Sequence, residues 1–185
     1  MPDEWAGSEK PMSLLKRLFG NAGPDPKLKL VPLYNQIVAK ARLPHWYVEG
    51  QVPDSIDGRF DMVAAILTLV ILRLEDDKSR AQDMAHLTEV FVDDMDGQLR
   101  EVGIGDMIVG KHIGNIMGAV GGRLGAFRDA LAEPAKLDNT ILRNIYRSEH
   151  ADPGALAHVR QALLDTERAL GSQLPEMIVE GGAIW

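Results

Sequence analysis

The chain has 185 residues, of which 45% are hydrophobic and 25% are charged, and its formal net charge is −7. These values are ordinary for a soluble globular protein with one real core. The absence of cysteine excludes disulfides, thiol catalysis and thiolate metal sites. The longest uncharged apolar run, Met62 to Leu72, is far shorter than the roughly 20 residues that span a bilayer.

Charge is unevenly distributed along the chain. Residues 1–47 carry seven basic and four acidic side chains, residues 48–106 carry five and fourteen, and the remainder carries eight and nine. Phosphate binding needs clustered Lys and Arg, so the acidic middle argues against a nucleic-acid partner. The net positive charge of residues 1–47 is compatible with a solvated tail. It is equally compatible with a contact to an anionic membrane surface or to RNA.

Residues 1–30 are expected to form a leader with one short amphipathic segment, from Met12 to Gly20. Its apolar residues lie beside two basic ones, which makes the segment a candidate for peripheral contact with a membrane. A single short amphipathic helix binds a membrane only weakly, so stable anchoring would need a second signal. The candidate membrane-contact residues are Leu14, Leu15, Lys16, Arg17, Leu18 and Phe19.

Apolar residues at helical spacing predict that residues 31–185 form one all-α domain, a bundle of about six helices. The second of these is apolar almost all round, which places it at the centre of the bundle. Serine or aspartate precedes four of the expected helices in the position favoured for an N-terminal cap, at Ser55 or Asp57, Asp106, Asp138 and Asp152. The expected helices cover about 33–42, 57–76, 78–102, 106–132, 138–147 and 153–170.

The fourth expected helix is unusually rich in glycine, since residues 103–125 hold eight of the eighteen glycines. Gly110, Gly114, Gly118 and Gly122 recur every four residues and therefore lie on one stripe of the helix. A stripe without side chains permits close approach of another helix. The favoured interpretation is internal packing against a neighbouring helix; the alternatives are an open groove for a client helix and a bend.

Three apparent site motifs do not support a site. Residues 105–112 match GxxxxGK, but His112 stands where a P-loop needs Ser or Thr and a helix, not a strand, precedes it. The aspartates around Asp94 fail the register of a calcium loop. The five histidines include no pair at metal-binding helical spacing. We therefore expect no metal, no cofactor and no catalytic residue.

Several short motifs nevertheless resemble one family. The runs ARLPHWYVEGQVPDSIDGRFDM, DMDGQLREVGIGDMIVGK and GGRLGAFRDAL, within residues 34–131, are similar to those of the ubiquinol–cytochrome c chaperones, the assembly factors of respiratory complex III. The start MSLLKRLFG is similar to that of bacterial members. The resemblance implies an α-helical, non-enzymatic chaperone that binds the cytochrome b precursor, with a partner assembly subunit in some members. It also implies a cytoplasmic location, with contact at the inner membrane as a further expectation.

A chaperone of this kind needs a groove and charges that orient its client. The expected ion pairs involve Asp54, Asp61, Asp93, Asp96 and Asp106, either within the bundle or facing a client. The alternative function is a small-ligand-binding protein or enzyme with a polar pocket around Arg59, Asp61, Arg100 and Asp106. The candidate client-binding residues are Trp46, Tyr47, Val52, Arg59, Arg100, Gly110, Lys111, Gly114, Gly118 and Arg123.

Overall fold

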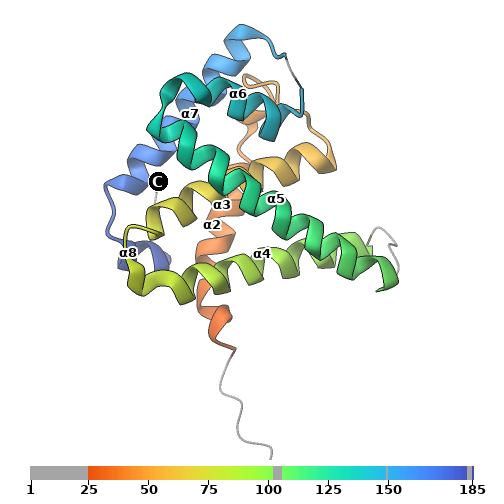
Figure 1. Ribbon diagram of the computed structural model, residues 1–185, viewed down its shortest axis with the longest axis vertical. Coiled ribbons are helices and arrows are strands. Elements are labelled where there is room, and N and C mark those ends of the chain that lie inside the picture. Colours follow the sequence, from red (N-terminus) through yellow and green to blue (C-terminus); the bar gives the residue numbers. More distant parts are fainter. Residues whose placement is uncertain (1–24, 102–105, 149, 183–184) are drawn as a thin grey trace, which may run out of the picture.

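The computed structural model describes residues 25–101, 106–148, 150–182 and 185. Within these residues it contains seven α-helices and no strand, which confirms the all-α prediction (Figure 1). The expected amphipathic segment at 12–20, with its six candidate membrane-contact residues, lies outside the described residues. The α-helices are α2 (Val31–Ala41), α3 (Ile56–Leu74), α4 (Ala81–Glu101), α5 (Asp106–Ala132), α6 (Leu137–Ile141), α7 (Pro153–Gly171) and α8 (Pro175–Val179).

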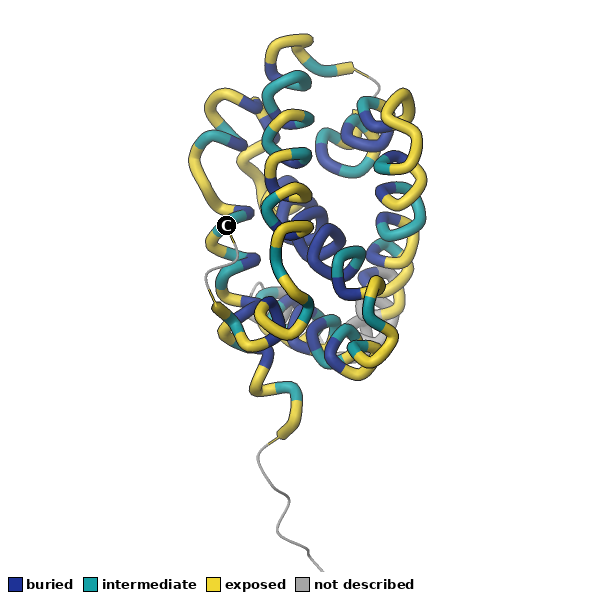
Figure 2. The backbone as a smooth tube through the Cα atoms, turned by 90° about the vertical axis from the view of Figure 1, so that its left-hand side faces the viewer, coloured by how far each residue is buried: buried dark blue, intermediate teal, exposed yellow. Residues whose placement is uncertain are grey.

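Helix α3 is the centre of the bundle, as its all-round apolar sequence predicts. Every residue from Asp61 to Ile71 is buried, and the helix lies against α2, α5 and α7. Figure 2 shows this continuous buried stretch inside the ring of partly exposed helices. Since each neighbour must bury one apolar stripe, α3 supplies the common surface on which the others pack.

Two of the expected caps are present, and one is wrong. The Ser55 hydroxyl accepts a hydrogen bond from the backbone N–H of Gly58 at 3.1 Å and so begins α3. The Asp152 carboxylate accepts one from Ala155 at 2.9 Å and begins α7. Asp138 does not cap a helix, because α6 already begins at Leu137 and the Asp138 carboxylate instead pairs with Arg160 at 3.1 Å.

The helix expected at 138–147 consists of an α-helical part and a π-helical part. Helix α6 is followed by a π-helical segment, Leu142–Tyr146, which ends at Arg147. Arg147 has φ +51, in the left-handed region, and such a conformation is uncommon for a residue other than glycine. The turn directs the Arg147 side chain back to α3, where it bonds Asp61.

The described chain begins with a 3-10 helix, Pro26–Leu30, that packs along α4. Leu30 is fully buried in the core, so the core already includes part of the expected leader. None of the helices in the described ranges is both long enough and apolar enough to cross a membrane.

Candidate functional site

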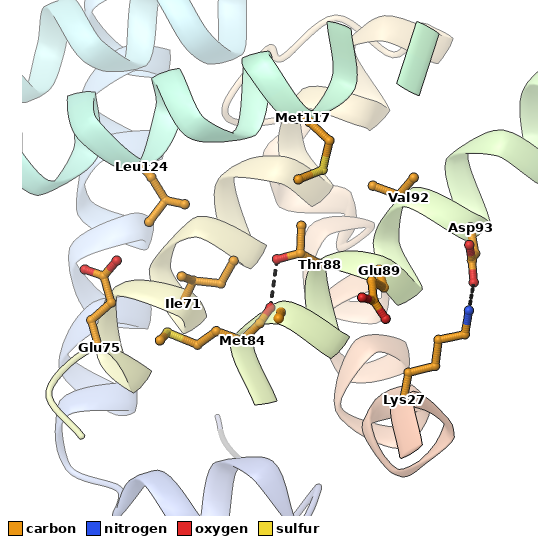
Figure 3. A pocket seen from close by; sticks show the side chains of 11 residues that line it. Lys27, Ile71, Glu75, Met84, Thr88, Glu89, Val92, Asp93, Met117 and Leu124 are labelled. Carbon is orange, nitrogen blue, oxygen red and sulfur yellow. Dashed lines mark hydrogen bonds and ion pairs between the residues drawn. The ribbon is translucent and has the colours of Figure 1, made fainter. Parts of the chain in front are cut away.

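An apolar groove runs between α4 and α5 (Figure 3). Its volume is about 540 Å³, within the range of pockets that bind ligands or side chains. Met84, Thr88 and Val92 of α4 form one wall, Met117 and Leu124 of α5 form the other, and Ile71 of α3 closes the base. We call this feature the α4–α5 groove.

The α4 wall follows from the helical register of α4. Leu87 and Phe91 are fully buried, so residues one position further along, Thr88 and Val92, lie at the edge of the core and face the groove. The Thr88 hydroxyl donates to the Met84 carbonyl at 2.8 Å. Because this polar group is already bonded within the helix, the wall presents mainly apolar surface.

The α5 wall is formed by Leu124, which packs against the core, and by the more exposed Met117. Ile116 and Val120 are buried, whereas Met117 is 45% exposed. Methionine is flexible and polarisable, and it is common on surfaces that accept varied apolar partners. An exposed methionine beside a groove is therefore suited to contact with another chain.

Acidic side chains dominate the rim of the groove. Glu75, Glu89 and Asp93 line it, together with a single cation, Lys27. The Lys27 ammonium lies 2.6 Å from the Asp93 carboxylate, and Glu75 accepts hydrogen bonds from Arg128 at 2.8 Å. Glu89 forms no ion pair among the described residues, so the rim keeps an uncompensated negative charge.

Three glycines of the α5 stripe, Gly114, Gly118 and Gly122, are open to solvent, and for them the expectation of internal packing is wrong. A Cβ atom added at Gly114, Gly118 or Gly122 would meet nothing within 4 Å, and all three residues are exposed. Gly114 and Gly118 lie within one turn of Met117 on α5, although neither residue lines the α4–α5 groove. Among the three interpretations weighed from the sequence, this placement agrees with an open surface next to a groove.

Two aromatic-loop candidates are core residues. Trp46 is fully buried and donates its indole N–H to the Lys40 carbonyl at 2.8 Å, and Val52 is 2% exposed. Neither can contact a client without local unfolding, so the structure corrects their assignment as client-binding residues. Tyr47 is half-buried, and its hydroxyl donates to the Ala41 carbonyl at 2.9 Å.

The family-like motif GRFD in α3 has a structural basis in close packing. A Cβ atom at Gly58 would overlap the backbone carbonyl of Pro53, so only glycine fits there. Three residues on, Asp61 is fully buried. Within this motif, Gly58 therefore permits close packing of the preceding loop on α3, and Asp61 supplies a buried carboxylate.

Asp61 is the centre of a buried ionic cluster. Its carboxylate accepts hydrogen bonds from Arg123 of α5 and from Arg147, the latter at 2.5 Å to Nε. Arg123 is 7% exposed, which corrects its assignment as a client-facing residue. Burial raises the pKa of the Asp61 carboxyl, opposed by the hydrogen bond from Arg147 and the charge of Arg123.

The remaining charged candidates do not form one patch. Arg59 lies on the surface and pairs with Asp54 at 2.6 Å, and its hydrogen bond lowers the pKa of the Asp54 carboxyl. Asp93 pairs with Lys27, a cation that the sequence did not indicate for it. Asp96 is half-buried on α4. The side chains of Arg100, Asp106 and Lys111, and the surroundings of Gly110, lie outside the described residues.

This arrangement counts against the polar-pocket alternative. Asp61 is occupied by Arg123 and Arg147 in the core, whereas Arg59 is directed to Asp54 at the surface. The two groups expected to converge on a ligand therefore have different partners and different environments. Neither lines the α4–α5 groove.

Sequence reasoning missed most of the groove. Thr88, Val92 and Met117 belong to none of the motifs and candidate sets of the sequence. A signal for Met117 was present, because the apolar positions Ile116 and Val120 place the core face of α5 about 60–100° away from it. The glycines of the stripe lie further round the helix, away from that core face.

An apolar groove between two helices is one of the surfaces on which proteins can accept a helix of another polypeptide. A sequence model described as "Ubiquinol-cytochrome C chaperone" matches residues 48–185. The chain belongs to the ubiquinol–cytochrome c chaperone family.

A solved structure agrees with this assignment. The chain is similar to the crystal structure of the Cbp3 homolog from Brucella abortus, with a TM-score of 0.73 and 26% sequence identity. The similarity covers 92% of this chain and 93% of that one. Among curated proteins, no match to this sequence is found.

Proposed function

We propose that this protein binds the cytochrome b precursor during assembly of the ubiquinol–cytochrome c reductase, without catalysing a reaction. Membership of the chaperone family supports a protein client in this assembly. The observation that carries the binding mode is the α4–α5 groove, whose apolar walls and exposed Met117 suit an apolar segment of another chain.

The chemistry of the client fits the groove. A cytochrome b precursor exposes apolar helices before its haems and neighbouring subunits are in place. Burying such a segment releases about 25 cal/mol for each Å² of apolar surface removed from water. The acidic rim then favours segments with basic flanks and disfavours acidic ones, which gives orientation more than affinity.

The experiment compares two methionines of similar exposure. Met117 is 45% exposed in the groove, and Met177 is 50% exposed on α8. Cells lacking the gene are complemented with Met117→Glu or with Met177→Glu, and haem b absorbance of the reductase is measured. We expect the gene deletion and Met117→Glu to lower this absorbance, and Met177→Glu to restore it.

Client identity is tested with a photocrosslinking residue at position 117 or 177 and antibody detection of cytochrome b. We expect a cytochrome b adduct from position 117 and none from position 177. Unchanged haem b absorbance in the deletion strain would reject the function. A normal reductase with Met117→Glu, together with cytochrome b adducts from both positions or neither, would reject the groove as its site.

A further inference from the structure

A second pocket lies between the last turns of α5 and the helical segment that includes α6, which packs against α5 (Figure 1). Its volume is about 250 Å³, less than half that of the α4–α5 groove, and the two share no lining residue. A pocket of this size takes a small ligand or one group of a larger one. We call it the α5–α6 pocket; its lining residues are Ala126, Lys136, Asn139, Thr140, Arg143 and Asn144.

The polar residues of this pocket lie on one face of the chain from 136 to 144. Each of the five lies three or four positions from another, so their side chains project from the same side of the helical segment. The lining residue from α5 is Ala126, which contributes only a methyl group. The pocket is therefore polar on the α6 side and leaves room for a ligand on the α5 side.

Thr140 has a hydroxyl without a hydrogen-bond partner among the described residues, although the residue is only 8% exposed. The other three threonines, Thr68, Thr88 and Thr166, each donate to the carbonyl four residues earlier, at 2.7–2.8 Å. A buried polar group left without a partner is rare and costs free energy. Because Thr140 lines the pocket, a ligand there can supply the missing partner.

The charge of the pocket is positive. Lys136 and Arg143 line it, and no acidic side chain is among its described lining residues. Arg143 is exposed and forms no ion pair within the described ranges. Lys136 pairs with Glu133 at 2.9 Å, but both side chains are more than half exposed, and such a pair contributes little. An anion in the pocket therefore meets at least one uncompensated cation.

The donors of the pocket suit a phosphate group. A guanidinium, an ammonium, a hydroxyl and an amide converge there, and the Asn139 amide has no side-chain hydrogen bond in the described part of the chain. A phosphate monoester offers three acceptor oxygens and about −1.5 to −2 charges at pH 7, which matches two cations and two neutral donors. A carboxylate offers two oxygens and one charge, so it would leave some of these donors unused.

We propose that the α5–α6 pocket binds the phosphate group of a phosphate monoester. Arg143 and Lys136 balance its charge, and the Thr140 hydroxyl and the Asn139 amide donate to its oxygens. A soluble phosphate ester and the head group of a lipid such as phosphatidic acid present this same chemistry. The site goes beyond the proposed function and is separate from the α4–α5 groove.

The test is a titration of the full-length chain with inorganic phosphate, followed by amide NMR at constant ionic strength. We expect phosphate to move the signals of Thr140 and Asn144 saturably. Chloride at the same ionic strength should leave them in place. Thr166 on α7 does not line the pocket, so its signal is the internal control.

A threonine pair tests the hydroxyl. Thr140→Val removes it, whereas Thr166→Val removes a hydroxyl that is bonded to the Ala162 carbonyl at 2.7 Å and lies outside the pocket. We expect Thr140→Val to raise the Kd for phosphate about tenfold or more and Thr166→Val to leave it unchanged. Because the Thr140 hydroxyl has no partner in the described part of the protein, Thr140→Val should not lower the thermal unfolding midpoint.

An arginine pair tests the charge. Arg143→Gln removes the uncompensated cation. Arg42→Gln removes another exposed arginine that has no ion pair in the described ranges and does not line the pocket. We expect Arg143→Gln to raise the Kd about tenfold or more, with no change from Arg42→Gln.

Vesicles of phosphatidylcholine, with and without phosphatidic acid, distinguish the two sources of the phosphate group. Flotation that needs phosphatidic acid and is lost in Thr140→Val and Arg143→Gln identifies a lipid head group. No flotation, with the phosphate titration intact, identifies a soluble ester.

Two outcomes would overturn the proposal. If inorganic phosphate causes no saturable shift at Thr140 and Asn144, the pocket does not bind phosphate. If Arg42→Gln or Thr166→Val weakens the response as much as the pocket variants do, phosphate acts as an adventitious ion only. None of these measurements involves cytochrome b, so the proposed function is judged separately.

Discussion

The carboxylate of Asp61 in α3 and the guanidinium of Arg123 in α5 form an ion pair inside the bundle, where Asp61 is 0% and Arg123 is 7% exposed. Arg123 also donates to the backbone carbonyl of Asn144 at 3.2 Å. The pair therefore fixes the position of α5, one wall of the groove, against the central helix and the π-helical segment.

We expect Asp61→Ala to lower the free energy of unfolding by about 3–5 kcal/mol, because it leaves the Arg123 charge buried without its partner. Asp57→Ala is the matched control, since Asp57 pairs with Arg147 at the surface at 3.0 Å and exposed pairs contribute about 0–1 kcal/mol. Urea unfolding measures both. A loss from Asp61→Ala no larger than that from Asp57→Ala would show that the buried pair does not stabilise the fold.

Tyr34 connects α2 to the other wall of the groove. Its hydroxyl donates to the Asp94 carboxylate of α4 at 2.6 Å, and burial followed by this hydrogen bond raises the pKa of the phenol. Hydrogen bonds to charged groups contribute about 1.5–3 kcal/mol, so we expect Tyr34→Phe to lower the free energy of unfolding by about this amount in urea unfolding. Tyr47→Phe removes a bond to a neutral carbonyl and should cost less; the reverse order would contradict this account.

Replacing an exposed glycine of α5 by alanine is predicted to raise the free energy of unfolding and to weaken binding of the client. Gly118→Ala places a methyl group in open space and should raise the free energy of unfolding by about 0.5–1 kcal/mol, the helix cost of glycine. If the proposed client lies along this edge, the same methyl group should reduce its crosslinking from position 117.

Gly171→Ala is the control for this effect. Gly171 ends α7, also with open space around its Cβ position, and lies outside the groove. It should leave client crosslinking unchanged. Full crosslinking with Gly118→Ala would show that the glycine edge does not contact the client.

The bounds of individual helices could be predicted because local chemistry sets them. The bounds predicted for α5 agree with those observed, and Ser55 and Asp152 cap α3 and α7 as their positions indicate. These features depend on residues within one turn of each other. The central position of α3 could be predicted in the same way, because its apolar run leaves no polar face that could be exposed to water.

The site could not be predicted to the same extent, because it depends on which face of each helix is covered. Periodicity placed Gly114 and Gly118 on one stripe but did not say whether a neighbour packs there. The link from Arg147 to Asp61 spans 86 residues and depends on a π-helical turn with a left-handed end. Neither feature has a signature in local residue spacing. Trp46 is a further case in which the sequence does not decide. An aromatic residue between two helices can lie on the surface or in the core, and the structure buries Trp46 fully.

The His45–His158 pair predicts a pH dependence of stability. The Nδ1 atom of His45 lies 3.0 Å from the Nε2 atom of His158, so one ring must accept a hydrogen bond from the other. Burial, and then the neighbouring His158, lower the pKa of His45 from its ordinary value of 6.5. The unfolded chain therefore binds more protons than the folded one as the pH falls below about 6.5.

It follows that the free energy of unfolding declines as the pH is lowered from 7.5 to 5.5, and that His45→Gln makes this decline shallower. Glutamine can still hydrogen-bond His158 but does not titrate. His150→Gln, at an exposed position, should keep the wild-type slope. Urea unfolding at both pH values measures the difference. Equal slopes in wild type and His45→Gln would mean that the pair does not oppose protonation of His45 in the folded state.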